Sequence, residues 1–126
     1  MGYAYADIEL SNPRLPELTK LGVRAMADTG ALTLCIAEHV RVQLQLEEAE
    51  KREVTIADGS RKMVPYVGPV QVRFKNRTCF VGALVLGDEV LLGAVPMEDL
   101  DLVVMPAQRS VEVNPDSPNF PQAKVK

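Results

Sequence analysis

The chain has 126 residues, of which 47% are hydrophobic and 25% charged, a balance typical of one soluble globular domain with a single core. Its formal net charge is −3 and its 14 Lys and Arg are scattered along the chain, which argues against a nucleic-acid partner. No apolar run approaches the ~20 residues that a membrane-spanning helix needs, and the first residues lack the pattern of a secretory signal. We therefore expect a cytoplasmic protein without a membrane partner.

Cysteine and histidine are scarce in this sequence. Cys35 and Cys79 lie inside apolar, strand-like runs, and His39 is the only histidine. We expect two buried free thiols rather than a disulfide. A single histidine argues against a histidine-dependent catalytic triad and against a multi-histidine metal site. The sequence therefore predicts neither a metal nor a cofactor.

The first third of the chain predicts short strands. Residues 5–10 (YADIEL) alternate between apolar and charged side chains, as in a half-buried strand. Residues 11–22 contain two prolines and a late glycine and are expected to form a connection. Residues 23–27 resume the β pattern and lead directly to Asp28. The side chains expected to share one face of the following strand are Leu32, Leu34 and Ile36.

The middle of the chain predicts a hairpin. Residues 37–46 fit either a strand or a short helix, because both periodicities are present. Residues 47–53 (EEAEKRE) form a mixed charge run and are expected to be a solvated connection. Residues 54–67 contain two apolar-rich arms around the tip 57–60 (Ala-Asp-Gly-Ser), and Asp-Gly is a strong hairpin signal.

The last part of the chain predicts further strands and a short helix. A second hairpin is expected from residues 70–74 and 79–86, and an apolar strand in 89–95 ends near Gly93. Pro96 is expected to open a short helix, and residues 102–105 form a last core strand. Together these elements predict a mainly β domain with a closed or folded-over sheet. We place that domain in residues 1–106, and expect 107–126 to be an extended or disordered tail, or to add an edge strand through Val111 and Val113.

One motif in this pattern carries chemistry. Asp28-Thr29-Gly30 follows an apolar strand, and taken alone it is a turn signal. The hairpin tip follows about thirty residues later, and Leu91-Leu92-Gly93 then runs into the short helix. This order resembles the retropepsin family of retroviral-type aspartic proteases, in particular its compact bacterial members. The resemblance spans about residues 5–105.

The resemblance implies a closed β-barrel of the acid-protease type with a flap hairpin and one or two short helices. It implies that Asp28 is the catalytic residue, that Thr29 hydrogen-bonds across to a partner loop, and that Gly30 allows close backbone approach and an unusual φ. Leu92 and Gly93 form the family's motif before the helix. The residues that the resemblance implies in substrate binding are Ala31, Ala57, Asp58, Gly59, Glu89 and Leu91.

The resemblance also has a consequence for assembly. Peptide hydrolysis by this route needs two carboxylates around one water, one acting as base and the other as acid. Like charges so close cannot both ionise easily, so one carboxyl stays protonated. The chain holds one Asp-Thr-Gly, and no other Asp has a comparable context. We therefore expect a homodimeric aspartic endopeptidase in which a two-fold axis brings two copies of Asp28 together around a protein or peptide substrate.

The sequence departs from the family's pattern in two places. Viral members carry an Asp and an Arg that support the dimer, where this chain has Leu32-Thr33 and Ala94-Val95. The hairpin tip has a single glycine, Gly59. Two other interpretations stay open: a retropepsin-like binding or dimerisation module with little turnover, and an unrelated small β-barrel in which Asp28 only shapes a turn. Glu89, with Asp88, either tunes the substrate pocket or occupies a solvated turn.

Overall fold

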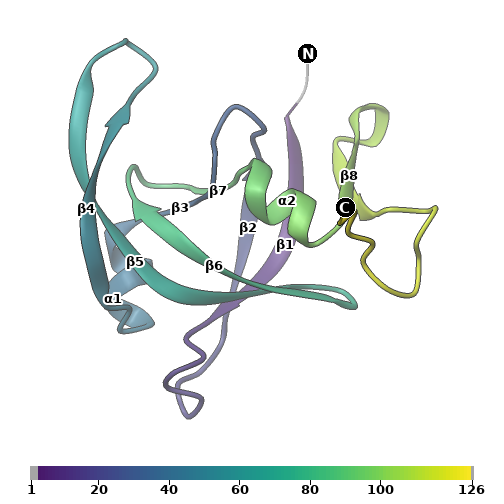
Figure 1. Cartoon of the computed structure of the whole chain (residues 1–126), viewed down its shortest axis with the longest axis horizontal. Helices are drawn as coiled ribbons and strands as arrows, with labels where there is room; N and C mark the ends of the chain where they lie inside the picture. The colour runs from purple at the N-terminus through teal and green to yellow at the C-terminus, as the bar shows by residue number, and fades with distance from the viewer. Residues whose placement is uncertain (1–2, 126) are drawn as a thin grey trace.

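The computed structural model describes residues 3–125, and strands dominate it (Figure 1). Within these residues there are nine strands, two short α-helices and one 3-10 turn. In chain order they are β1 (Ala4–Ser11), β2 (Leu21–Ala27), β3 (Leu34–Ile36), α1 (Glu38–Gln43), β4 (Glu48–Thr55), β5 (Arg61–Phe74), β6 (Arg77–Val85), β7 (Val90–Leu92), α2 (Ala94–Asp99), β8 (Leu102–Met105), η1 (Pro106–Gln108) and β9 (Ser110–Val113).

Six of the strands close into a barrel. The hydrogen-bonded order runs β5-β6-β3-β7-β2-β1, and β1 then pairs back onto β5 between Glu9–Ser11 and Gln71–Arg73. Closure depends on the length of β5, whose 14 residues contact β4 at one end and β1 at the other. The prediction of a mainly β, closed sheet with a hairpin and short helices is therefore confirmed.

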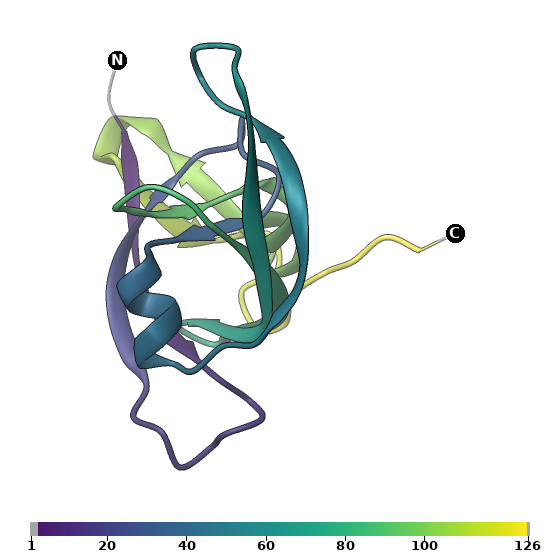
Figure 2. The same ribbon diagram turned by 90° about the vertical axis from the view of Figure 1, so that its left-hand side faces the viewer.

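The barrel interior holds the apolar core, and the β1 pattern shows why. Ala6, Ile8 and Leu10 are each at most 3% exposed, while Asp7 between them faces solvent, so the alternation predicted for this strand is confirmed. Residues 37–46, which the sequence left open, contain α1, and Val40 belongs to the core cluster. Figure 2 shows α1 away from the hairpin tip, toward the other end of the barrel. No helix in residues 3–125 is long and apolar enough to cross a membrane.

The β4–β5 hairpin extends outside the barrel. Its tip lies at residues 56–60, as expected, and it projects beyond the barrel in both views (Figures 1 and 2). The expectation that 47–53 is a solvated connection is wrong, because β4 covers most of this run. The strand is almost entirely exposed and exists through its backbone pairing with β5. The charged composition of β4 correctly indicates that the strand is exposed, whereas its extended conformation depends on pairing with β5.

Two smaller expectations are also corrected. Leu32 does not share a strand face with Leu34 and Ile36, because β3 begins only at Leu34 and Leu32 is 67% exposed. The backbone of the preceding loop is instead held by the start of α2, whose Val95 N–H donates to the Leu32 carbonyl at 2.8 Å. α2 begins at Ala94, and Pro96 lies within its first turn, where a proline removes no helical hydrogen bond.

The C-terminal segment packs onto the barrel through Asp101. β9 pairs with β8, and Tyr5 of β1 pairs with Ser110. After β9, the Asp101 carboxylate accepts hydrogen bonds from Asn114 Nδ2 (3.1 Å), Ser117 Oγ (2.5 Å) and the Gln122 N–H (2.9 Å). Arg77, fully buried at the start of β6, donates to the Ser117 carbonyl. Val111 and Val113 do lie in a strand, while a domain boundary at residue 106 stays a prediction.

Asp101 should make the stability of this segment acid-sensitive. The three hydrogen bonds, that from Ser117 first, lower the pKa of the Asp101 carboxyl to about 2 from 3.8. A carboxyl whose folded pKa is depressed stabilises the fold above its unfolded pKa and loses that effect as pH falls through the folded value. We expect Asp101→Asn to lower the melting temperature at pH 7, and the gap to wild type to narrow as the pH falls from about 4 to 2. Thermal unfolding across this pH range measures both; a constant gap would contradict the expectation.

Candidate active site

The loop that carries Asp28 crosses the end of a central strand. β7 lies between β2, to which it is parallel, and β3, to which it is antiparallel. β2 and β3 are consecutive in the chain, so their connection, residues 28–33, must pass over the carboxyl end of β7. This crossing brings Asp28 next to Leu92 and Gly93, which follow it in the sequence by more than sixty residues.

Asp28 is held by its backbone and keeps most of its carboxylate free. Its N–H donates to the Leu92 carbonyl at 3.0 Å, and its own carbonyl accepts from the Ala31 N–H at 3.0 Å. In the side chain, Oδ1 accepts the Gly30 N–H at 3.0 Å. The side chain is half-buried, while Thr29 and Gly30 beside it are exposed. A rigid backbone with a free carboxylate oxygen is the arrangement that a general acid or base requires.

The space beside Gly30 is limited by the Asp28 carboxylate. The expectation of an unusual φ is wrong, because Gly30 is not among the glycines with positive φ, which are Gly59, Gly68 and Gly87. A Cβ at Gly30 would instead lie 3.1 Å from Asp28 Oδ1, closer than ordinary van der Waals contact. A side chain here would therefore press on the oxygen that accepts the Gly30 N–H.

Gly93 lets the loop cross β7 at close range. A Cβ at Gly93 would lie 2.3 Å from the Thr33 carbonyl oxygen and 2.7 Å from that of Ala31, both rigid backbone atoms. Just beyond it, the Ala94 N–H donates to the Ala31 carbonyl at 2.8 Å. A glycine fits before the helix because the Asp28 loop and the start of α2 approach closely and are joined by backbone hydrogen bonds.

Gly93→Ala should consequently destabilise the fold. The clash is with backbone on both sides, so the loop must move as a whole, and we expect a cost of about 3 kcal/mol, the upper part of the range for overpacking. Gly22→Ala is the matched control, because nothing lies within 4 Å of a Cβ built at Gly22. Urea unfolding measures both variants. Equal unfolding midpoints for Gly93→Ala and Gly22→Ala would contradict the expectation, because the backbone around Gly93 would then accommodate a Cβ without cost.

Two exposed apolar side chains flank the Asp28 loop. Leu32 is 67% exposed and Val95 is 44% exposed, and the hydrogen bond from Val95 N–H to the Leu32 carbonyl places their backbones together. Both belong to the large apolar side chains that remain exposed in the described residues.

Three of the residues that the resemblance implies in substrate binding, Ala57, Asp58 and Gly59, form a tight turn at the tip of the β4–β5 hairpin. The Asp58 carboxylate accepts hydrogen bonds from the Ser60 N–H (2.8 Å) and the Ser60 hydroxyl (2.6 Å), and the hydroxyl in particular lowers the pKa of Asp58. Gly59 has φ +87°, which the turn requires. Ala57 is exposed beside them. Asp58 thus closes the turn, and in this chain the tip belongs to the projecting hairpin rather than to the Asp28 loop (Figure 1).

The remaining predicted site residues lie near the loop but differ in access. Ala31 is half-buried within the loop, and Leu91 is half-buried on β7 opposite Cys35. Glu89 is exposed in the bend that precedes β7. The structure therefore places Ala31, Leu92 and Gly93 at the Asp28 loop, with Leu91 next to Leu92 on β7, and leaves Glu89 and the hairpin tip exposed on other segments.

Both cysteines are free and buried, as predicted. Burial, and secondarily the charge of Asp28, raises the pKa of the Cys35 thiol. Burial with the charge of Asp99 raises the pKa of Cys79 to about 12. Neither thiol is therefore a competent nucleophile at neutral pH. In residues 3–125, no group of three or more His, Cys, Asp or Glu side chains is arranged to hold a metal ion.

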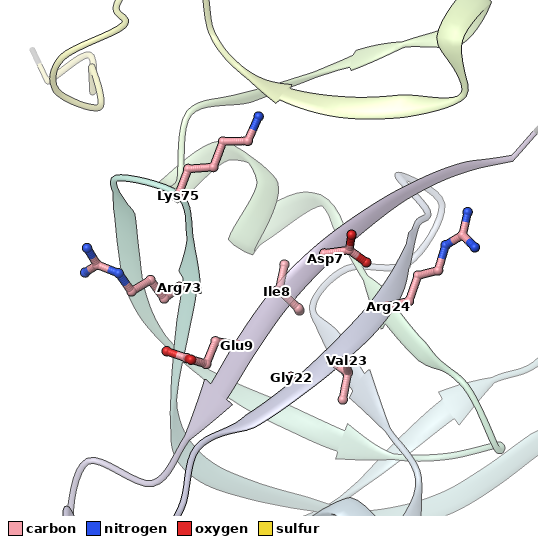
Figure 3. A pocket seen from close by; sticks show the side chains of 8 residues that line it. All are labelled: Asp7, Ile8, Glu9, Gly22, Val23, Arg24, Arg73 and Lys75. Carbon is pink, nitrogen blue, oxygen red and sulfur yellow. The ribbon is translucent and has the colours of Figure 1, made fainter.

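Two surface hollows adjoin β1 and β2, and Asp28 lines neither of them. One, of about 550 Å³, lies over β1, β2 and β5, and Figure 3 shows its charged side chains, such as Asp7, Arg24 and Lys75, spreading apart rather than converging. A hollow of about 330 Å³ borders the loop through Ala27 and Thr29 and is otherwise lined by residues 3–4 and by residues between Val104 and Arg109. Asp28 itself is half-buried in the single chain.

Sequence reasoning gave no role to two residues that support this loop. Thr33 is 6% exposed, and its hydroxyl donates to the Gly82 carbonyl on β6 at 3.0 Å. This bond ties the end of the Asp28 loop to the next strand of the barrel. The isolated glycine within the apolar run 79–86 was the available signal, since a strand glycine often marks a close approach of another group.

Comparison with known proteins gives a likeness in fold only. No protein-family model matches the chain, and no curated protein matches its sequence. Among solved structures, it is similar to the protease of Simian Foamy Virus (mac), with TM-score 0.48 and 18% identity over 74% of this chain and 90% of that one. It is also similar to a Legionella pneumophila protein of unknown function, with TM-score 0.47 and 14% identity over 82% of this chain and 93% of that one.

Proposed function

We propose that this protein is a homodimeric aspartic endopeptidase of the retropepsin type, in which two symmetry-related Asp28 carboxylates activate one water. The observation that carries the proposal is the Asp28 loop itself. Its backbone is held by Leu92, one carboxylate oxygen takes the Gly30 N–H, and the half-buried carboxylate makes no other side-chain hydrogen bond in the described residues. A carboxylate held in this way has the rigidity of a catalytic group and lacks only a partner.

A second copy supplies that partner by symmetry. The other aspartates of the chain lie in other elements: Asp58 closes the hairpin tip and Asp101 holds the C-terminal segment. A two-fold axis beside Asp28 brings identical residues together, so each chain contributes half of the site. The exposed pair Leu32 and Val95 gives this contact an apolar component, and the exposed Thr29 hydroxyl is free to bond across the axis.

The chemistry follows from two carboxyl groups that share one proton. The ionised Asp28 accepts a proton from a water molecule while the water oxygen attacks the peptide carbonyl carbon. The protonated Asp28 of the other copy donates its proton to the carbonyl oxygen, forming a neutral gem-diol. Collapse of this intermediate re-forms a carbonyl and breaks the C–N bond, and the nitrogen takes a proton from the pair as it leaves. The sum is one water consumed for each bond cleaved.

The loop neighbours fit a peptide substrate. Ala31 adds little volume beside Asp28, which leaves room for a main chain, and Leu91 offers an apolar surface on β7. The β4–β5 hairpin is long and exposed, and its edge strand has free backbone groups with which an extended peptide can pair. Ala57, Asp58 and Gly59 at its tip and Glu89 in the bend are the surface residues that we assign to the border of the substrate.

A subunit-mixing experiment tests the shared site. Wild-type and Asp28→Asn chains are mixed at fixed total concentration, left to exchange subunits, and assayed on an unfolded protein such as casein. If one water needs both carboxylates, activity follows the square of the wild-type fraction, so an equal mixture retains about one quarter of the wild-type rate. About one half of that rate would mean that each chain has a complete site. Absence of cleavage by the wild type would favour a binding or dimerisation module.

A further inference from the structure

An aromatic side chain outside the barrel lies directly on the backbone of Gly82. Tyr66 of β5 pairs with Leu84 of β6, so Gly82, two residues along, is its diagonal neighbour on the same face. A Cβ at Gly82 would lie 2.2 Å from both the Cζ and the hydroxyl oxygen of Tyr66. The ring therefore occupies the place of the missing side chain, and any residue larger than glycine displaces it.

The same ring is held from the hairpin side by a cation. The guanidinium carbon of Arg52, on β4, lies 3.6 Å from the Tyr66 ring centroid, and Arg52 Nε donates to Glu50 at 2.8 Å. Such stacking is favourable because the face of the ring carries negative potential. Tyr66 thus joins the outer strand of the hairpin to β6, across β5.

The connection continues from β6 into the Asp28 loop. The carbonyl of Gly82 accepts the hydroxyl of Thr33, a buried residue of that loop. Thr33 in turn contacts Gly93, where the loop crosses β7. A continuous row of contacts therefore runs from Arg52 through Tyr66, Gly82 and Thr33 to the loop that holds Asp28.

The base of the hairpin is the place where its backbone pairing is irregular. The β4–β5 register shifts between Glu48 and Glu50, and the β5–β6 register shifts between Val67 and Val70. Glu48 pairs with Val67, so both irregularities fall at one level of the hairpin. A hollow of about 320 Å³ adjoins this level and is lined in part by Glu48, Tyr66 and Gly82. Where backbone pairing is interrupted, the hydrogen bonds between strands constrain the direction of the hairpin less. Side-chain contacts at this level must then set that direction.

We propose that Tyr66 is a positioning residue that sets the direction of the β4–β5 hairpin relative to the Asp28 loop. The structural part of this inference is independent of the proposed function, and only the expected effect on substrate binding rests on it. When the ring sits on Gly82, the hairpin is held to the barrel wall that also anchors Thr33. When the ring is removed, the hairpin pivots at the irregular level and is no longer placed over substrate. Tyr66 touches neither Asp28 nor the reacting atoms, so its effect falls on substrate binding more than on the chemical step.

Two variants disrupt this contact from opposite sides. Tyr66→Ala removes the ring, and Gly82→Ala pushes it away. Tyr66→Phe keeps the ring and serves as the conservative rescue, and Gly22→Ala is the matched glycine control, because a Cβ there has nothing within 4 Å. Amide hydrogen exchange of the folded protein gives a readout that needs no activity. We expect hairpin amides in residues 50–64 to exchange about tenfold faster in Tyr66→Ala and Gly82→Ala, with β2 and β7 unchanged.

Peptide cleavage provides the second readout. We expect Tyr66→Ala to raise KM about tenfold with a smaller change in kcat, and Tyr66→Phe to behave as wild type. Unchanged hairpin exchange in Tyr66→Ala, or an equal rise throughout the barrel, would overturn the proposal, because the ring would then have no role or only a general structural one. If wild type shows no cleavage, the proposed function fails, while hydrogen exchange alone still decides whether Tyr66 positions the hairpin. If Gly82→Ala does not fold, Tyr66→Ala and Tyr66→Phe decide.

Discussion

Asp28→Asn should abolish peptidase activity and leave the fold and the dimer intact. The amide keeps the size of the side chain, and its oxygen can still accept the Gly30 N–H, the one side-chain hydrogen bond of Asp28 in the described residues. It can neither take a proton from water nor hold the shared proton, so both halves of the acid–base pair fail. Loss of such a pair should lower kcat by about 10³-fold or more.

The assay compares wild type and Asp28→Asn on casein across pH, with circular dichroism and sedimentation as checks of fold and assembly. Wild-type activity should be highest at acidic to near-neutral pH, where the pair of carboxyls carries one proton, and should fall as rising pH removes that proton. Asp7→Asn is a useful control carboxylate, because Asp7 is exposed on the solvent face of β1 and has no role in the proposed site. Equal cleavage by wild type and Asp28→Asn would refute the assignment of Asp28.

Leu32→Asp should dissociate the dimer and remove activity at ordinary protein concentrations. In the proposed dimer each copy buries Leu32 near the two-fold axis, so the variant brings an unpaired charge from each chain into the interface. The dimer dissociation constant should rise by about 100-fold or more. Sedimentation across a concentration series measures this constant, and activity per chain should then increase with concentration.

The chain offers both a control and a rescue for this variant. Val42 on α1 is 62% exposed, close to the 67% of Leu32, but it lies on an element away from the Asp28 loop, so Val42→Asp should leave assembly unchanged. Adding Val95→Arg to Leu32→Asp places a cation beside the new carboxylate, since the backbones of the two residues are hydrogen-bonded. We expect partial recovery of the dimer. If the Leu32→Asp protein sediments like the wild type, Leu32 does not lie in a dimer interface.

Local sequence patterns predicted the elements whose conformation depends on near neighbours. The alternation in residues 5–10 predicted β1, because one face of that strand is buried all along its length. The Asp-Gly pair predicted the hairpin tip, because Asp58 and Gly59 satisfy the turn by themselves. The order of Asp28-Thr29-Gly30 and Leu91-Leu92-Gly93 carried the resemblance that implies one catalytic site, and that site stays a prediction; the structure shows that the Asp28 N–H donates to the Leu92 carbonyl.

Features that depend on a partner strand or on contacts between particular side chains and backbone were predicted poorly. The charged run in 47–53 carries no apolar pattern, and only pairing with β5 makes it a strand. Leu32 has the period of a core residue, but the start of α2 takes its carbonyl and leaves its side chain in solvent. The unusual φ expected for Gly30 was wrong. The missing side chain of Gly30 leaves room for the Asp28 carboxylate instead, and residue types alone do not reveal this contact.

The sequence by itself determined the β class, the hairpin tip and the residues of the Asp28 loop, because hydrophobic periodicity and turn chemistry act over a few residues. Only the tertiary structure decided how that loop is supported. The crossing over Gly93 and the bond from Thr33 to Gly82 join segments far apart in the chain, and the ring of Tyr66 on Gly82 connects β5 to the strand that receives this bond. These contacts arise because β5, β6, β3 and β7 lie side by side, and this strand order is a property of the whole sheet that no local stretch encodes.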